Sequence, residues 1–287
     1  MRPGFRNFVL VISFLSLISF SCKKEKEQEV LEFDTQTAQD NALAEGVFND
    51  VNNIANQAIK NGSGGLTTYR FTDQSATFLS TCATVTITPD STVTGGLANV
   101  DFGSTNCLCL DGHYRRGVIN FTYTGQYGDS GTVITTTFDN YFVGKDTTLM
   151  FEVTGSKTVT NFGTNNAGHI YFGIDVDGHI IDSQGRTMDW TSSRFREWIA
   201  GESTLTWLDD EYLITGSANG TNFEGNSYTM NITHALDIDF SCYWIKEGTF
   251  DLTPSGKATR TFDYGSGVCD NQASVAVNGQ TFPVTLR

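Results

Sequence analysis

From about residue 66 to the end of the chain, apolar and polar residues alternate with a period of two. Thr, Val, Ile, Tyr and Phe dominate this stretch, and Gly and Asx-Gly pairs interrupt it, which is typical of strands joined by hairpins. Ile119, Phe121 and Tyr123 fall on one face of such a strand, with polar residues on the other. The pattern predicts an all-β fold: a large curled antiparallel sheet with long meander strands, as an open barrel or a sandwich, and one wet side. The strand candidates are 115–124, 131–143, 148–160, 167–176, 179–190, 211–220, 226–235 and 238–250.

Two Asx-Gly pairs predict the positions of hairpin turns. Asn278-Gly279 suits a type I′ turn, in which both central residues need a positive φ. Counting outward places Val275 opposite Phe282 and Ala273 opposite Val284, and Pro283 suits an edge strand. Asp177-Gly178 predicts a second hairpin, between the candidates 167–176 and 179–190.

One segment before the strands has a helical period. Residues 35–60 place apolar side chains on a single stripe, and Asn61-Gly62 suits the helix end; the stripe is Leu43, Val47, Val51, Ile54 and Ala58. The helix either packs this stripe on the domain behind it or serves as a spacer that lifts the domain off a membrane. The predicted organisation is therefore a helix with a Gly/Ser joint over 35–65 and a single antiparallel β domain over 66–287.

The N-terminus has the features of an export signal. Two arginines precede an apolar run over residues 8–20, which is shorter than the ~20 residues of a membrane-spanning helix. The run ends in Ser19-Phe20-Ser21-Cys22, which resembles a loose bacterial lipobox. We predict a signal peptide over 1–21, acylation of Cys22 and a charged tether over 22–34, so that the membrane is a partner through the N-terminal lipid. The alternative is ordinary signal peptidase cleavage that leaves Cys22 unmodified.

The charge balance excludes some partners. The 287 residues include 18 Lys plus Arg and 32 Asp plus Glu, for a formal net charge of -14. A nucleic-acid-binding protein needs a basic face to neutralise phosphates, so no nucleic-acid partner is expected.

The remaining cysteines predict two disulfides. Cys242 and Cys269 are equidistant from a predicted turn at Ser255-Gly256, so an unbulged hairpin would place them opposite each other. Cys82 and Cys107 repeat this arrangement around Pro89-Asp90, which leaves Cys109 over. Cys107-Leu108-Cys109 lacks a second ligand pair at zinc spacing, so no metal and no cofactor are predicted.

Two segments also share a TGSxxxTNF pattern, which stands at 154–162 and again at 215–223. Duplication, equivalent bends in one sheet and common hairpin chemistry are the three explanations.

Several spaced motifs together resemble uncharacterised Bacteroidetes-type outer-membrane lipoproteins, over most of residues 35–287. This resemblance implies an outer-membrane location, facing either the periplasm or the cell exterior, and it assigns no catalytic residue. The motifs are the run 144–161, Trp190-x3-Arg194-x-Arg196-x-Trp198-Ile199-x-Gly201, Asp209-Asp210-x-Tyr212-x-Ile214-Thr215-Gly216, Ser241-Cys242-x-Trp244-Ile245 and Asp263-Tyr264-Gly265 through Cys269-Asp270-Asn271.

Candidates for catalysis are few. Gly128-Asp129-Ser130-Gly131 resembles a serine-protease nucleophile loop without the flanking motifs, and a polar hairpin loop explains it better. Asp175-x-Asp177-Gly178 is only a fragment of a calcium loop. Two carboxylates suffice for glycoside hydrolysis, and Asp237 with Asp239 would share a strand face, whereas Asp209 and Asp210 would not.

A cluster of aromatic and cationic residues is the main candidate for ligand binding. It consists of Trp190, Arg194, Arg196, Trp198 and Trp207. Aromatic rings stack on sugars and Arg pairs with carboxylates, but core tryptophans with arginines lying over them are the other interpretation. The sequence thus predicts a lipid-anchored, non-enzymatic binding protein for a glycan or protein, which would bind on the open side of the sheet. An envelope polysaccharide hydrolase and a structural surface lipoprotein without a ligand are the alternatives.

Overall fold

A computed structural model describes residues 35–62, 68–70, 83–89, 95–204, 209–242 and 244–285. The helix is α1 (Thr35–Gly62). The strands are β1 (Thr68–Arg70), β2 (Thr84–Pro89), β3 (Gly96–Asp101), β4 (Cys107–Leu108), β5 (Tyr114–Tyr123), β6 (Val133–Gly144), β7 (Phe151–Thr164), β8 (Ile170–Ile181), β9 (Thr187–Ala200), β10 (Glu211–Thr221), β11 (Ser227–Asp239), β12 (Glu247–Pro254), β13 (Arg260–Ser266), β14 (Gln272–Val277) and β15 (Gln280–Thr285).

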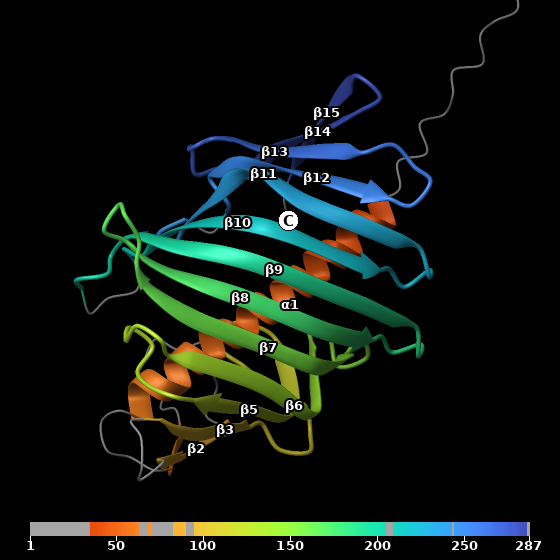
Figure 1. The fold of residues 1–287 in the computed structure, drawn as a ribbon. Coiled ribbons are helices and arrows are strands. Elements are labelled where there is room, and N and C mark those ends of the chain that lie inside the picture. Colours follow the sequence, from red (N-terminus) through yellow and green to blue (C-terminus); the bar gives the residue numbers. More distant parts are fainter. Residues whose placement is uncertain are drawn as a thin grey trace, which may run out of the picture. The chain divides into compact units, whose positions relative to one another are not determined.

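The strands form one antiparallel meander, which confirms the predicted all-β class. Each strand pairs with its neighbours in the chain, except that β3 pairs with β5 and the short β4 joins only the end of β5. Among the described strands the sheet stays open, with β1 and β15 as its edges, and it is one continuous sheet rather than a sandwich of two (Figure 1). The predicted signal peptide and tether lie outside the described residues.

Helix α1 crosses one face of this sheet diagonally (Figure 1). Val47, Val51, Ile54 and Ala58 are buried and Leu43 is partly buried, so the predicted stripe faces the sheet and the packing interpretation is confirmed. Burial alternates along the strands, most regularly from Thr187 to Arg196 of β9, which gives the sheet an inner face toward α1 and an outer face toward water. The helix is not apolar enough to cross a membrane.

The last hairpin forms as predicted. Val275 pairs with Phe282 and Ala273 with Val284 across β14 and β15. Asn278 and Gly279 adopt φ values of 51° and 75°, as a type I′ turn requires. Because β15 is an edge strand, Pro283 removes no hydrogen bond from the interior of the sheet.

The predicted hairpin at Asp177-Gly178 is wrong. Strand β8 runs unbroken through both residues, and the turn lies further on, where the Asp182 amide donates to the Arg186 carbonyl at 3.0 Å. Gly178 is needed within the strand because a Cβ there would lie 2.3 Å from the ring of Phe48 on α1. The predicted strand 179–190 is therefore divided between β8 and β9. The predicted strand 238–250 is likewise divided, between the end of β11 and the start of β12.

The repeated TGSxxxTNF pattern marks two equivalent bends. Gly155 in β7 and Gly216 in β10 have φ values of 101° and 118°, which only glycine adopts readily in the middle of a strand. The β10–β11 register shifts between Ile214 and Ser217, so this bend is a bulge. Such bends let the long strands curl over α1.

The Cys242–Cys269 disulfide is present, with a Cα–Cα distance of 5.8 Å. It closes a hairpin formed by β12 and β13, as predicted. By loop entropy alone it stabilises the fold by at most about 3.5 kcal/mol.

Cys107 also forms a disulfide, but its predicted partner Cys82 lies outside the described residues. Cys109 is buried, and its thiol lies 3.8 Å from the Cys107 carbonyl.

Candidate ligand-binding cavity

A cavity of about 240 Å³ lies between α1 and the inner face of the sheet. Its lining is mostly aliphatic and aromatic, with a small group of charged and polar side chains. The residues come from α1 and from β7 to β11, with two more from the segment that follows β11. They are Glu45, Phe48, Asn49, Asn52, Lys157, Ile174, Val176, Trp190, Ser192, Arg194, Arg196, Tyr212, Ile214, Ile232, Leu236, Ile238, Phe240 and Ile245.

Polar contacts of the N-terminal half of α1 hold the helix in place over the cavity. The indole Nε1 of Trp190 donates to Asn41 at 3.1 Å, and its ring stacks on Phe48 with centroids 5.7 Å apart. At the start of the helix, Asp40 accepts a hydrogen bond from the Phe223 amide at 3.0 Å. These bonds hold the helix at a set position above β9, so the cavity is enclosed by ordered elements.

Three cationic side chains line this otherwise apolar space. Lys157 of β7 is 2% exposed, and Arg194 and Arg196 of β9 are 7% and 9% exposed. Glu45 on α1 is the acidic residue of the lining. The formal charge of the lining is therefore positive, although the whole chain is strongly acidic.

Each of the first two cations has a partner on α1. The Nζ of Lys157 donates to the Phe48 carbonyl at 2.7 Å. The Nη2 of Arg194 pairs with Glu45 and also lies 3.6 Å from the sulfur of Met230. The Nη1 of Arg194 is buried, with no hydrogen-bond partner in the described part of the chain.

Arg196 is held differently. Its guanidinium carbon lies 4.8 Å from the ring centroid of Tyr212, 5.1 Å from that of Phe172 and 5.7 Å from that of Tyr127. Its Nε and Nη2 are buried and find no hydrogen-bond partner among the described residues. Cation–π contacts offset part of the cost of burying the charge, but they leave these N–H donors unsatisfied.

Burial also changes the ionisation of the lining. It lowers the pKa of Lys157 to about 7, against a partial opposing effect of Asp50. Burial raises the pKa of Glu45, and Arg194 offsets part of that shift. The charge in the cavity is therefore sensitive to pH near neutrality, because Lys157 changes its charge there.

The structure brings most of the predicted Trp/Arg cluster to one region. Trp190, Arg194 and Arg196 all face α1 from β9. Trp198 is half-buried beside Tyr212, with ring centroids 5.5 Å apart, and Trp207 lies outside the described residues. The arginines thus point into the interior rather than onto an open sheet face.

Sequence reasoning missed several members of the lining. Lys157 lies between Val153 and Val159 among the alternate residues of β7 that face inward. A charged residue among inward-facing apolar ones was the signal that could have identified it. Ser192 lies between Trp190 and Arg194 by the same alternation. The contribution of Glu45 had no local signal, because it depends on where α1 docks.

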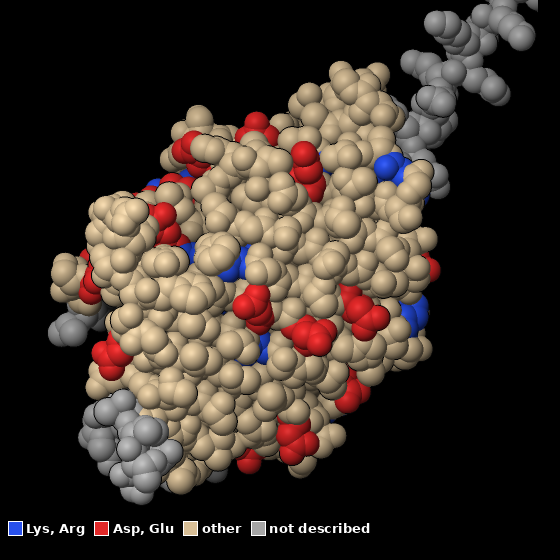
Figure 2. Space-filling model, viewed as in Figure 1, with Lys and Arg blue, Asp and Glu red and all other residues tan. Residues whose placement is uncertain are grey.

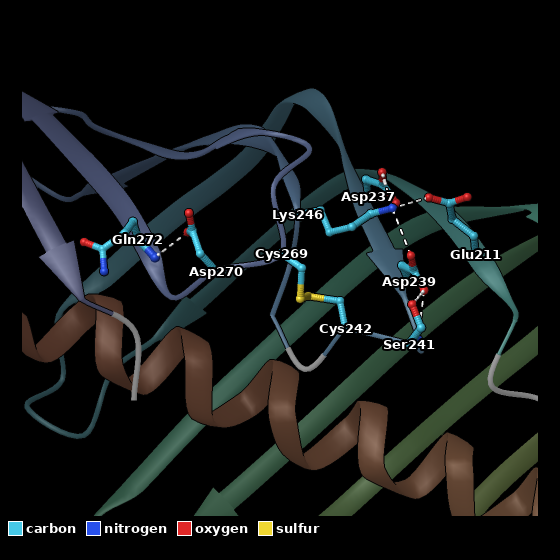
Figure 3. The surroundings of a disulfide bond; sticks show 9 residues. All are labelled: Glu211, Asp237, Asp239, Ser241, Cys242, Lys246, Cys269, Asp270 and Gln272. Atoms are coloured by element: carbon cyan, nitrogen blue, oxygen red, sulfur yellow. Dashed lines mark hydrogen bonds and ion pairs between the residues drawn. A yellow bond between two sulfur atoms is a disulfide. The ribbon is translucent and has the colours of Figure 1, made fainter.

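Asp237 and Asp239, one of the two carboxylate pairs singled out in the sequence, meet Glu211 away from the cavity. Lys246 Nζ lies 2.5 Å from Glu211, 3.0 Å from Asp239 and 3.5 Å from Asp237, close to the Cys242–Cys269 disulfide (Figure 3). Burial and then Glu211 raise the pKa of Asp237. Because all three carboxylates converge on one ammonium, the arrangement is that of an ion-pair network. Asp209 is exposed and Asp210 is buried, so these neighbours do face different ways.

The outer face of the sheet carries a small aromatic patch, formed by Phe162, Tyr171 and Phe195 on β7, β8 and β9. The ring centroid of Phe162 lies 5.4 Å from that of Tyr171 and 6.3 Å from that of Phe195. Phe162 and Phe195 are 48% and 50% exposed. Beside this outer aromatic patch, Glu197 accepts one hydrogen bond from Asn165 at 2.8 Å and contacts His169 at 2.7 Å. The molecular face in Figure 2 shows scattered acidic side chains and few basic ones.

No protein-family model, curated protein or solved structure matches this chain. Within the described residues, no group of three or more His, Cys, Asp or Glu side chains is placed to hold a metal ion.

Proposed function

We propose that the protein is a lipid-anchored cell-envelope protein that binds a small, largely apolar molecule in the cavity beneath α1. The observation that carries this proposal is the cavity itself, which is lined mainly by aliphatic and aromatic side chains. Concave, mostly apolar spaces with a few placed polar groups are where proteins bind small ligands. The predicted signal and Cys22 support the envelope location and the membrane as a partner.

The size of the cavity limits the ligand. A water molecule takes up ~30 Å³ in the liquid, so about 240 Å³ corresponds to roughly eight non-hydrogen atoms. Octanol is therefore a suitable neutral probe. The carboxylates near Lys246 do not favour the hydrolase alternative, because they are engaged with that lysine.

A matched pair of variants tests the site. Ser192 lines the cavity, whereas Ser193, the next residue of β9, is exposed on the outer face. Ser192→Phe should abolish octanol binding measured by calorimetry, while Ser193→Phe should bind octanol as the unmodified protein does. Equal octanol binding by both variants would reject the cavity as the site.

The outer aromatic patch favours a glycan as the second candidate ligand, since exposed rings stack on the apolar faces of sugars. Phe195→Ala should then weaken retention on at least one of cellulose, xylan and chitin, while Thr191→Ala, an exposed change on the same strand, should not. Absence of retention on all three polymers would remove this candidate.

A further inference from the structure

Four arginines are buried in the described part of the chain, and they differ in the hydrogen-bond and ion-pair partners of their guanidinium groups. Arg115 contacts two carboxylates at 2.6 Å, and Arg194 pairs with Glu45. Arg260, away from the cavity, donates to the Ala258 carbonyl at 2.8 Å. Arg196 lines the cavity, and its Nε and Nη2 have no hydrogen-bond partner among the described residues, although Asp210 is near enough to act on its charge.

A buried arginine whose N–H donors lack acceptors destabilises the fold unless another group supplies those acceptors. Buried N–H donors without acceptors destabilise a fold, and the cost is larger when the group is charged. The Nε and Nη2 of Arg196 are buried, so bulk water does not meet these two donors. The guanidinium has a rigid fork of donors that matches the two oxygens of a carboxylate. The missing partner is therefore an acceptor that arrives from the cavity.

The neighbouring groups support an acceptor that carries negative charge. Arg194 lies two residues away on the same face of β9, roughly 7 Å along the strand, and its Nη1 also lacks a partner among the described residues. Lys157 contributes a third cationic group to the lining, and Glu45 offsets one. Asp210 and Asp50 act on the charges of Arg196 and Lys157 from outside the lining. A neutral hydroxyl would satisfy one donor of Arg196 and would leave the lining itself with more cationic than acidic groups.

The rest of the lining defines the other end of the ligand. Ile174, Val176, Ile214, Ile232 and Leu236 offer only aliphatic surface. A polyhydroxylated sugar would leave its hydroxyl groups unsatisfied against these side chains.

We infer that the ligand of this cavity is an amphipathic monocarboxylate with a short acyl chain, whose carboxylate is bound by Arg196 with Arg194 beside it. This inference rests on the proposed function and adds the chemical class of the ligand. The head group lies at the guanidinium of Arg196, and the chain lies along the aliphatic wall from β8 to β11.

Three probes with the same apolar chain test the inferred ligand class separately from the proposed function. Octanoate, octanol and octylamine share an apolar chain and differ in the head group. Calorimetric titration of the full-length protein should give an affinity for octanoate about tenfold or more above that for octanol, the value of a charged hydrogen bond, and should show no binding of octylamine. Equal affinities for octanoate and octanol would overturn the carboxylate inference and leave the cavity proposal intact. No binding of any probe would reject the proposed function itself.

A variant locates the head group. Arg196→Met keeps the bulk of the side chain and removes the charge, and apolar replacement of a buried charge is often tolerated. It should reduce octanoate affinity about tenfold or more and so remove the preference for octanoate over octanol. Unchanged octanoate affinity in this variant would overturn the role of Arg196. Should the variant not fold, the comparison of octanoate with octanol on the unmodified protein still decides the ligand class.

Discussion

Replacing Arg115 with methionine is expected to lower the free energy of unfolding by about 3–5 kcal/mol, which is the typical cost of breaking a buried ion pair from one side. Arg115 of β5 is fully buried, and its Nη2 lies 2.6 Å from Asp50 on α1 and 2.6 Å from Asp111. Burial by itself would raise the pKa of Asp111, but hydrogen bonds from His113 and Arg115 hold that pKa well below its ordinary value. Without Arg115, two poorly solvated carboxylates lose their counter-charge.

The loss should be visible as a lower midpoint in urea denaturation. Arg186→Met is the control, because the Arg186 side chain is 48% exposed where it pairs with Asp182 in the β8–β9 turn, and ion pairs open to solvent contribute about 0–1 kcal/mol. Adding Asp50→Asn to Arg115→Met should recover part of the lost stability, because it removes one of the stranded charges. Equal stabilities of Arg115→Met and Arg186→Met would contradict this account of how α1 is joined to β5.

Replacing Lys157 with methionine is expected to stabilise the ligand-free protein in mildly acidic solution. The pKa of Lys157 falls from 10.5 to about 7 on burial. Between these two values the unfolded chain binds more protons than the folded one, so stability rises with pH across this window. Below pH 7 the folded protein holds a buried ammonium, at a cost of about 1.4 kcal/mol for each unit of the shift.

The expected gain from Lys157→Met is thus a few kcal/mol at pH 6, shrinking as the pH approaches 10. Urea denaturation at several pH values between 6 and 10 measures it. Lys145→Met, in the exposed turn after β6, should show no such pH-dependent gain. A constant difference between Lys157→Met and the unmodified protein across this range would show that the lysine does not titrate as described.

The sequence predicted the features that depend on neighbouring residues. The stripe from Leu43 to Ala58 and the turn at Asn278-Gly279 each follow from local spacing and backbone preference. Asp177-Gly178 has an equally strong local turn signal, but there the ring of Phe48, far away in the sequence, requires a glycine within a strand. A non-local contact decided that position, so the local rule failed.

The same distinction applies to the candidate site. Alternation along β9 placed Arg194, Arg196 and Trp198 on one face, and it could not say whether that face was open or covered. The answer depends on α1, whose docking converts one face of the sheet into an interior. The balance of charge there becomes apparent only when Lys157 of β7 and Glu45 of α1 are seen to line the same cavity.

The order of the strands has a consequence for how the chain assembles. Nearly every strand pairs with the next one along the chain, so the sheet can grow hairpin by hairpin through short loop closures, which are kinetically cheap. Helix α1 precedes the described strands, and it contacts β2 and β3 as well as β8 and β9. It is made early, but its docking over the cavity is complete only after β8 and β9 exist. The binding space is therefore one of the last parts of the molecule to form.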